Sequence, residues 1–183
     1  ARESQRGLGR AARRVCRAAL LLALALGFAG RAEAGTLYVA TNGNGSAGTS
    51  WLTAYTNLQD AIDAAAPTDT IYVAGHTFVV TSQVDWAKSD LTVLGGYAAT
   101  NAADTPGPYD AQQWPTTLSR SSDRTRIFYF HDLTNAVLRR VTVSGGYPAN
   151  ETSGGGLYIS NVESLILDDC RITDNHVYYA GWV

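Results

Sequence analysis

The sequence predicts an all-β fold, a right-handed parallel β-helix (solenoid) with an N-terminal capping α-helix. Three observations lead to it: an arginine-rich and then apolar leader, two later segments that repeat each other without a gap, and a single short helical pattern ahead of that repeat. We expect residues 35–183 to form the N-terminal part of this domain, with the coil truncated at the C-terminus.

Residues 1–34 have the layout of a secretory signal peptide. Seven arginines lie among them, and the apolar run Ala18–Ala29 leads into the small-residue motif Ala32–Ala34. The run has twelve residues, fewer than the roughly 20 that a membrane-spanning helix needs. We therefore expect cleavage between Ala34 and Gly35, followed by secretion or by display at the cell surface in association with the outer membrane. A membrane anchor is the alternative.

Without this leader the chain keeps seven basic and fourteen acidic residues, a net charge of −7. An acidic surface repels phosphate, and no basic cluster with interleaved aromatic residues is present, so we expect no nucleic-acid partner. Residues 43–48 spell Gly-x-Gly-x-x-Gly, but no helix opens at the third glycine as a dinucleotide site requires. Cys170 is the one cysteine left after cleavage, so packing and not a disulfide must hold the core.

The first element expected in the domain is the helix, at about residues 57–66. Thr56 and Gln59 have the spacing of a capping box, and Leu58 and Ile62 follow at helical spacing among alanines. The end of a solenoid core is otherwise open to solvent, so we expect this amphipathic helix to cover it.

Short strands are expected next, over residues 70–74 and 77–80. The segment Leu91–Tyr97 ends in Gly-Gly-Tyr as Val141–Tyr147 does, which predicts one glycine turn at the same corner of two coils. The intervening residues 98–124 carry three prolines and are expected to form a surface loop.

Residues 128–146 and 157–175 are the two copies of the repeat. Apolar and polar residues alternate over short stretches of each copy, which is the period of a strand. Such a unit cannot bury its own apolar face and must stack on a neighbour, so the sheets are expected to be parallel and the crossover right-handed. Seven positions are apolar in both copies and predict stacked core columns: Phe128/Leu157, Phe130/Ile159, Leu133/Val162, Ala136/Leu165, Leu138/Leu167, Val141/Cys170 and Val143/Ile172.

The order of motifs resembles a known group of proteins. From Leu37 to Phe78 a strand, a Gly/Asn loop with Trp51, the helix and a first strand follow one another, and Gly154–Leu157 is followed by Ile172–Asn175. The chain thus resembles the secreted β-helix proteins of the pectin-lyase-like superfamily, in particular bacterial proteins with polymorphic-outer-membrane-protein-type repeats. Those repeats prefer Phe where Ile172 stands.

The resemblance implies two functions of different class. The first is a non-enzymatic solenoid used for adhesion or carbohydrate contact, with extracellular polysaccharide or a host or cell-surface glycan as partner. The second is a polysaccharide lyase or a glycoside hydrolase; lyases of this superfamily use Ca²⁺, and no other cofactor is expected. We favour the first, because the sequence carries no convergent catalytic site.

Four residues are candidates for these functions. Asp168 and Asp169 are the best acidic pair for catalysis, but Arg139 and Arg140 stand at the aligned positions, so the two signs could equally pair across coils at a solvated corner. Tyr129 and Tyr158 share an outward column and could contact sugar rings, although tyrosines also simply favour strands. The histidines, His76, His131 and His176, lack the spacing of a metal site, so we expect no bound metal.

Overall fold

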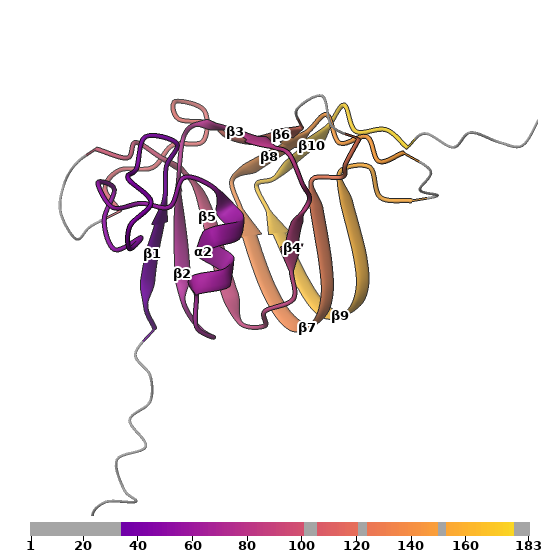
Figure 1. The fold of residues 1–183 in the computed structure, drawn as a ribbon, viewed down its shortest axis with the longest axis horizontal. Coiled ribbons are helices and arrows are strands. Elements are labelled where there is room, and N and C mark those ends of the chain that lie inside the picture. The colour runs from indigo at the N-terminus through magenta and orange to yellow at the C-terminus, as the bar shows by residue number, and fades with distance from the viewer. Residues whose placement is uncertain (1–33, 101–105, 121–123, 150–152, 178–183) are drawn as a thin grey trace, which may run out of the picture. The chain divides into compact units, whose positions relative to one another are not determined.

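The structure, a computed structural model, describes residues 34–100, 106–120, 124–149 and 153–177. The expected signal peptide, apart from Ala34, lies outside the described residues. One helix and ten strands make up the described part (Figure 1): β1 (Thr36–Val39), α2 (Leu58–Ala64), β2 (Thr70–Ala74), β3 (Thr77–Val80), β4 (Val84–Trp86), β5 (Leu91–Tyr97), β6 (Thr116–Arg120), β7 (Phe128–Arg139), β8 (Val141–Ser144), β9 (Leu157–Asp168) and β10 (Arg171–Thr173).

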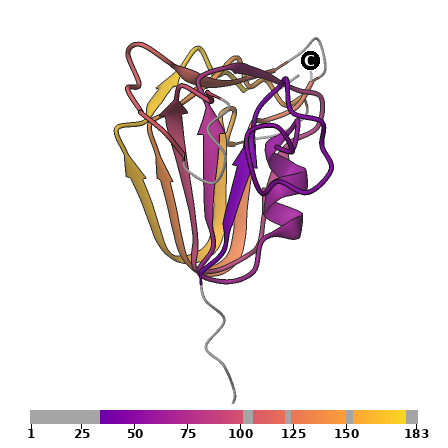
Figure 2. The same cartoon turned by 90° about the vertical axis from the view of Figure 1, so that its left-hand side faces the viewer.

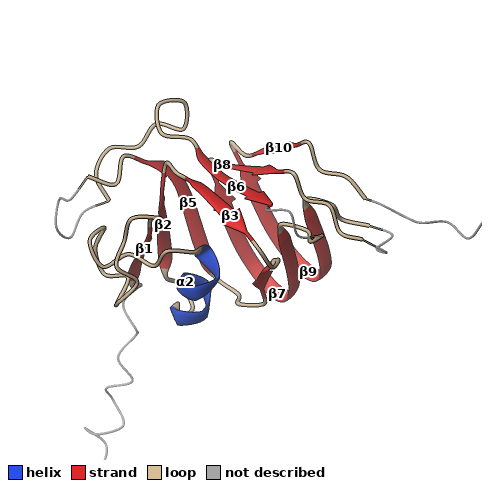
Figure 3. Ribbon diagram, turned by 45° about the horizontal axis from the view of Figure 1, so that its top comes forward, coloured by secondary structure: helices blue, strands red, loops and turns tan. Residues whose placement is uncertain are grey.

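The strands form two sheets. Within each sheet, all paired strands are parallel. One sheet has the order β1-β2-β5-β7, with β4 and β9 also paired to β7; the other has the order β3-β6-β8-β10 (Figure 3). The long strand β7 pairs with β4 through its first three residues and with β5 through its last four. Neither sheet closes on itself. The predicted mostly-β fold with parallel sheets is therefore confirmed.

The predicted gapless alignment of the two copies is the observed register between their strands. Strand pairing joins six of the seven predicted column pairs: Phe128/Leu157, Phe130/Ile159, Leu133/Val162, Ala136/Leu165, Leu138/Leu167 and Val143/Ile172. The backbone repeats as well. Left-handed conformations recur at aligned positions at three corners, Asp132/Asn161, Arg140/Asp169 and Gly145/Asp174.

Two sequence predictions about the earlier strands are wrong. The expected loop 98–124 contains β6, because the alternating buried side chains of Thr116 and Leu118 face the core. Strand β6 pairs with β8, whereas Leu91–Tyr97 lies in the other sheet beside β7. The Gly-Gly-Tyr endings of Leu91–Tyr97 and Val141–Tyr147 thus belong to different sheets and do not mark one corner.

The expected helix is present, but its cap differs from the prediction. Asn57, not Thr56, is the N-cap residue, and its side chain accepts a hydrogen bond from the backbone N–H of Asp60. The N-cap bond thus lies one residue later than predicted, and the Asp60 carboxylate accepts from the Asn57 side chain instead of the backbone N–H that a capping box uses. Helix α2 packs beside β1, β2 and β4 (Figure 2), and its buried side chains Leu58 and Ile62 join the main core.

The glycines and the asparagine of the repeat signature contact each other. The Asn175 side chain accepts from the backbone N–H of Gly146 at 2.8 Å and donates to the carbonyls of Val143 and Thr173. A side chain at Gly146 would collide with the carbonyl of Gly155. In the second copy, Asn175 therefore closes the turn by a side chain that replaces backbone partners.

No described helix is long and apolar enough to span a bilayer.

Candidate functional site

Tyr129 and Tyr158, called here the tyrosine pair, lie on the outer face of β7 and β9, which run side by side in Figure 1. They are register partners, and their rings stack with centroids 5.2 Å apart at an interplanar angle of 24°. Both are half-buried, whereas Phe128 and Phe130 point inward and are fully buried. Strand alternation thus produces the outward pair as the sequence predicted.

A cation and a third ring extend this aromatic surface. The guanidinium of Arg126 lies 4.6 Å from the ring centroid of Tyr158 and 5.9 Å from that of Tyr129. His131 stacks on Tyr129 with ring centroids 4.3 Å apart. Sequence reasoning missed both residues. The signal for His131 was its position two residues after Tyr129, which places it on the same face of the strand; Arg126 precedes the strand and carries no such signal.

His131 is held between two carboxylates. Its Nε2 lies 2.8 Å from Asp85 Oδ1 and its Nδ1 lies 2.9 Å from Asp132 Oδ2. The hydrogen bonds to Asp132 and then to Asp85 raise the pKa of His131, because both favour the protonated ring. The pKa of Asp132 is lowered, first by the hydrogen bond from Asn161 and then by that from His131. With both ring nitrogens facing carboxylates, the contacts favour the protonated ring and leave neither nitrogen free to bind a metal ion.

The arrangement suits a ligand with a flat apolar side and a polar edge. Sugar rings pack their C–H faces on aromatic rings and hydrogen-bond at their rims. The stacked rings of Tyr129 and Tyr158 supply an aromatic surface, while the partly exposed carboxylates of Asp85 and Asp132, which also bond His131, lie beside His131 as hydrogen-bond acceptors.

The structure separates the two catalytic candidates. Asp168 Oδ2 lies 3.1 Å from Arg139 Nε, so the cross-coil ion pair considered from the sequence is present. Asp169 adopts a left-handed backbone at the corner and lines a cavity of about 630 Å³. The two carboxylates therefore have different surroundings, Asp168 beside Arg139 and Asp169 at the cavity.

The cavity beside Asp169, called here the corner cavity, collects charges from three segments. Asp110, Arg140 and Arg171 line it together with Asp169. Arg140 is fixed in place, since its Nε donates to the carbonyl of Gly95 at 2.9 Å and its guanidinium stacks on the Tyr109 ring at 4.3 Å. Sequence reasoning missed Asp110, because it lies in a loop that no repeat register relates to residue 169.

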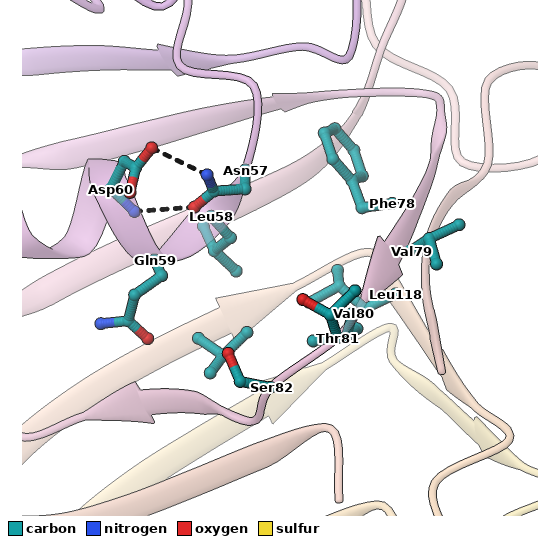
Figure 4. Close-up of a pocket in the computed structure, with 11 residues that line it drawn as sticks. Asn57, Leu58, Gln59, Asp60, Phe78, Val79, Val80, Thr81, Ser82 and Leu118 are labelled. Atoms are coloured by element: carbon teal, nitrogen blue, oxygen red, sulfur yellow. Dashed lines mark hydrogen bonds between the residues drawn. The ribbon is translucent and has the colours of Figure 1, made fainter. Parts of the chain in front are cut away.

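A second cavity, of about 420 Å³, lies between the start of α2 and the end of β3 (Figure 4). Its inner wall is apolar, formed by buried side chains such as Leu58, Phe78 and Leu118, and its rim carries Thr81 and Ser82. Helix α2 contacts β1, β2 and β4, and the cavity lies in the corner between α2 and β3. The cavity is thus a place where the short helix fails to fill the space beside the core.

Another aromatic cluster lies on the outer face of β1, β2 and β5, and it is covered. Tyr38 and Tyr97 are 2% and 4% exposed, because Trp51 from the following loop packs against both. Trp51 also donates from Nε1 to the carbonyl of Pro106 at 3.2 Å. Outward-facing aromatic side chains such as Tyr38 and Tyr97 therefore have a packing role where a loop covers them.

The remaining candidates have structural roles. Burial raises the pKa of the Cys170 thiol, which packs against the core and donates to the carbonyl of Leu138, as expected of a small apolar residue. His76 accepts from the backbone N–H of Thr41, and burial lowers its pKa. Within the described ranges, no group of three His, Cys, Asp or Glu side chains is placed to hold a metal ion.

Comparison of the chain with protein-family models, with curated proteins and with solved structures finds no match.

Proposed function

We propose that this chain is an exported protein whose domain is a right-handed parallel β-helix of the pectin-lyase-like type. Three features support the proposal: parallel pairing throughout, one gapless register between the two copies, and left-handed corners that recur in that same register. A β-helix accounts for all three, because each coil repeats the backbone of the coil before it.

The domain acts at the cell surface or outside the cell as a non-enzymatic adhesion module that contacts glycans through the tyrosine pair. One observation carries this function: the Tyr129 and Tyr158 rings stack on an outer face and stay partly exposed, with the Arg126 guanidinium over the Tyr158 ring, whereas Trp51 packs on Tyr38 and leaves it 2% exposed.

Glycan-array binding of the chain tests this function. The Tyr129→Ala/Tyr158→Ala variant should lose binding, whereas Tyr109→Ala should keep it, because Tyr109 is an exposed tyrosine away from the pair. Circular dichroism checks that each variant is folded. Equal binding by the folded double variant would show that the pair is only structural.

Export has its own test. The proposal requires processing between Ala34 and Gly35, so the N-terminal sequence of secreted material should begin at Gly35. A secreted protein that begins before Arg31 would contradict it.

The corner cavity favours a second candidate function, glycoside hydrolysis. It provides what the sequence did not show, a second carboxylate, Asp110, facing the same space as Asp169. A glycosidase uses two carboxylates around the scissile bond. The cavity does not fit the Ca²⁺ of the superfamily's lyases, because that ion takes six to eight oxygen ligands and two guanidiniums, Arg140 and Arg171, lie among its walls.

Release of reducing ends from a panel of polysaccharides tests hydrolysis. Asp110→Asn and Asp169→Asn should each abolish it. Asp168→Asn is the matched control, since Asp168 is the neighbouring carboxylate but pairs with Arg139 outside the cavity. Activity that survives both cavity variants would exclude this site.

A further inference from the structure

The first residue of the proposed mature chain contacts a buried carboxylate. The backbone nitrogen of Gly35 donates to Asp69 Oδ1 at 2.6 Å. Asp69 is 8% exposed and is one of the few charged residues buried in the described part of the chain. A charged group is seldom buried unless it has a partner. The contact with Gly35 therefore needs an explanation in terms of charge pairing.

Both ends of this contact are held in place. The second carboxylate oxygen of Asp69, Oδ2, accepts from the backbone N–H of Ala66 at 2.8 Å. The carbonyl of Gly35 accepts from the backbone N–H of Thr70 at 3.0 Å, where β1 starts to pair with β2. The pairing of β1 with β2 thus fixes the position of the Gly35 nitrogen beside the Asp69 carboxylate.

Glycine at this position permits the close approach. A side chain at residue 35 would place its Cβ 2.8 Å from Asp69 Oδ1, which is closer than a carbon atom can come to that oxygen without displacing it. The short contact between the nitrogen and the carboxylate thus depends on the residue that the signal-peptide pattern places immediately after the cut.

We propose that the α-ammonium group of Gly35, created by removal of the leader, forms a buried ion pair with Asp69 that stabilises the processed domain. Hydrolysis adds one water across the Ala34–Gly35 peptide bond and leaves a carboxylate on Ala34 and an ammonium on Gly35. The nitrogen keeps its position and changes from a neutral amide donor into a cation. The inference rests on the proposed cleavage site.

The gain comes from charge and not from a new contact. In the precursor, Asp69 accepts a hydrogen bond from a neutral amide; in the processed chain the same atom pair is charge-assisted, and such bonds are roughly twice as strong. Since Asp69 is largely shielded from water and the contact is partly buried, salt screens the pair less than it screens an ion pair on the surface. The processed chain is therefore the more stable form.

Three versions of the protein test the proposal by urea unfolding: the chain starting at Gly35, the same chain with its N-terminus acetylated, and the chain that retains Ala34. A fusion whose protease leaves no extra residue provides the first. We expect the unfolding equilibrium constant of the free Gly35 form to be about fivefold to tenfold smaller than that of the other two. Equal stability of the free and acetylated forms would overturn the proposal.

Substitution of the carboxylate completes the test. In Asp69→Asn the three versions should become equally stable, whereas Asp63→Asn, an exposed carboxylate on α2, should leave the difference intact. If Asp69→Asn does not fold, the acetylated form still decides, because it keeps the hydrogen bond and removes the charge. Purified chains answer this question whatever the exported protein's N-terminus proves to be, so failure of the ion pair and failure of the cleavage site are distinguishable.

Discussion

The two copies of the repeat share one register but differ in burial. In the first copy the seven column residues, from Phe128 to Val143, are at most 3% exposed. In the second copy Ile159, Leu167 and Ile172 are 48%, 37% and 50% exposed. Strands β7 and β8 have a described neighbour on both sides, whereas β9 and β10 have one.

This difference shows that one copy of the repeat does not bury its own apolar face. The two copies have similar apolar patterns, so composition cannot explain why one is inside and the other is half-exposed. Burial comes from the neighbours on each side, as in other stacked architectures. Equivalent substitutions in the two copies should therefore have unequal effects.

The largest effect is expected in the column that joins Val143 to Ile172. Val143→Asp places a charge without a partner at a fully buried position and should lower the free energy of unfolding by about 4 kcal/mol. Ile172→Asp should cost about 1 kcal/mol or less, because half of that side chain is already exposed. Urea unfolding measures both.

Thr142→Asp is the control within the first copy, since Thr142 is the neighbouring residue and faces outward. An equal loss in the free energy of unfolding for Val143→Asp and Ile172→Asp would show that the two copies do not differ in burial as described.

A smaller effect is expected at the two asparagines. Asn175→Ala removes three hydrogen bonds in a partly buried turn, two of them to the first copy, and should cost about 1 to 3 kcal/mol. Asn161→Ala removes one exposed bond to Asp132 and should cost less than about 1 kcal/mol. Thermal unfolding at equal protein concentration compares the two. The reverse order would show that the signature asparagine does not close the turn.

The smallest effect concerns His131, whose partner in the second copy is Ser160. The pKa of His131 is raised above its ordinary value of 6.5. The contribution of His131 to the free energy of unfolding is therefore fully present below pH 6.5. It is lost as the pH rises through the raised pKa. Stability should fall by less than about 1 kcal/mol as the pH rises from below 6.5 through the raised pKa, since the ion pairs are partly exposed.

His131→Gln should remove this slope, and Ser160→Ala should leave it unchanged. A slope that persists in His131→Gln would assign it to another group.

The sequence predicted the later part of the fold better than the earlier part. The register between the two copies could be found because six column pairs and three corners repeat without a gap. No such repeat relates β6 to its neighbours in the sequence. Strand β6 pairs with β8 because the loop that precedes β6 brings the chain back beside it. The shared Gly-Gly-Tyr ending of Leu91–Tyr97 and Val141–Tyr147 wrongly suggested that these two segments were equivalent.

The candidate site was predictable only in part, for the same reason. Alternation along β7 and β9 placed the tyrosine pair, because neighbours in a strand face opposite ways. The separation of Asp168 from Asp169 depends on a left-handed corner, and the arrival of Asp110 beside Asp169 depends on a loop. Neither follows from local periodicity.

Disulfide formation between β7 and β9 tests the central claim, in-register parallel stacking, most directly. Val137 and Ile166 are register partners, at a spacing that a disulfide can bridge, whereas residues two positions further along lie beyond about 7 Å. In a Cys16→Ser/Cys170→Ala background, Val137→Cys/Ile166→Cys should cross-link on mild oxidation. Val137→Cys/Ser164→Cys and Val137→Cys/Asp168→Cys should not. Preferential cross-linking of either shifted pair would contradict the register and the stacking built on it.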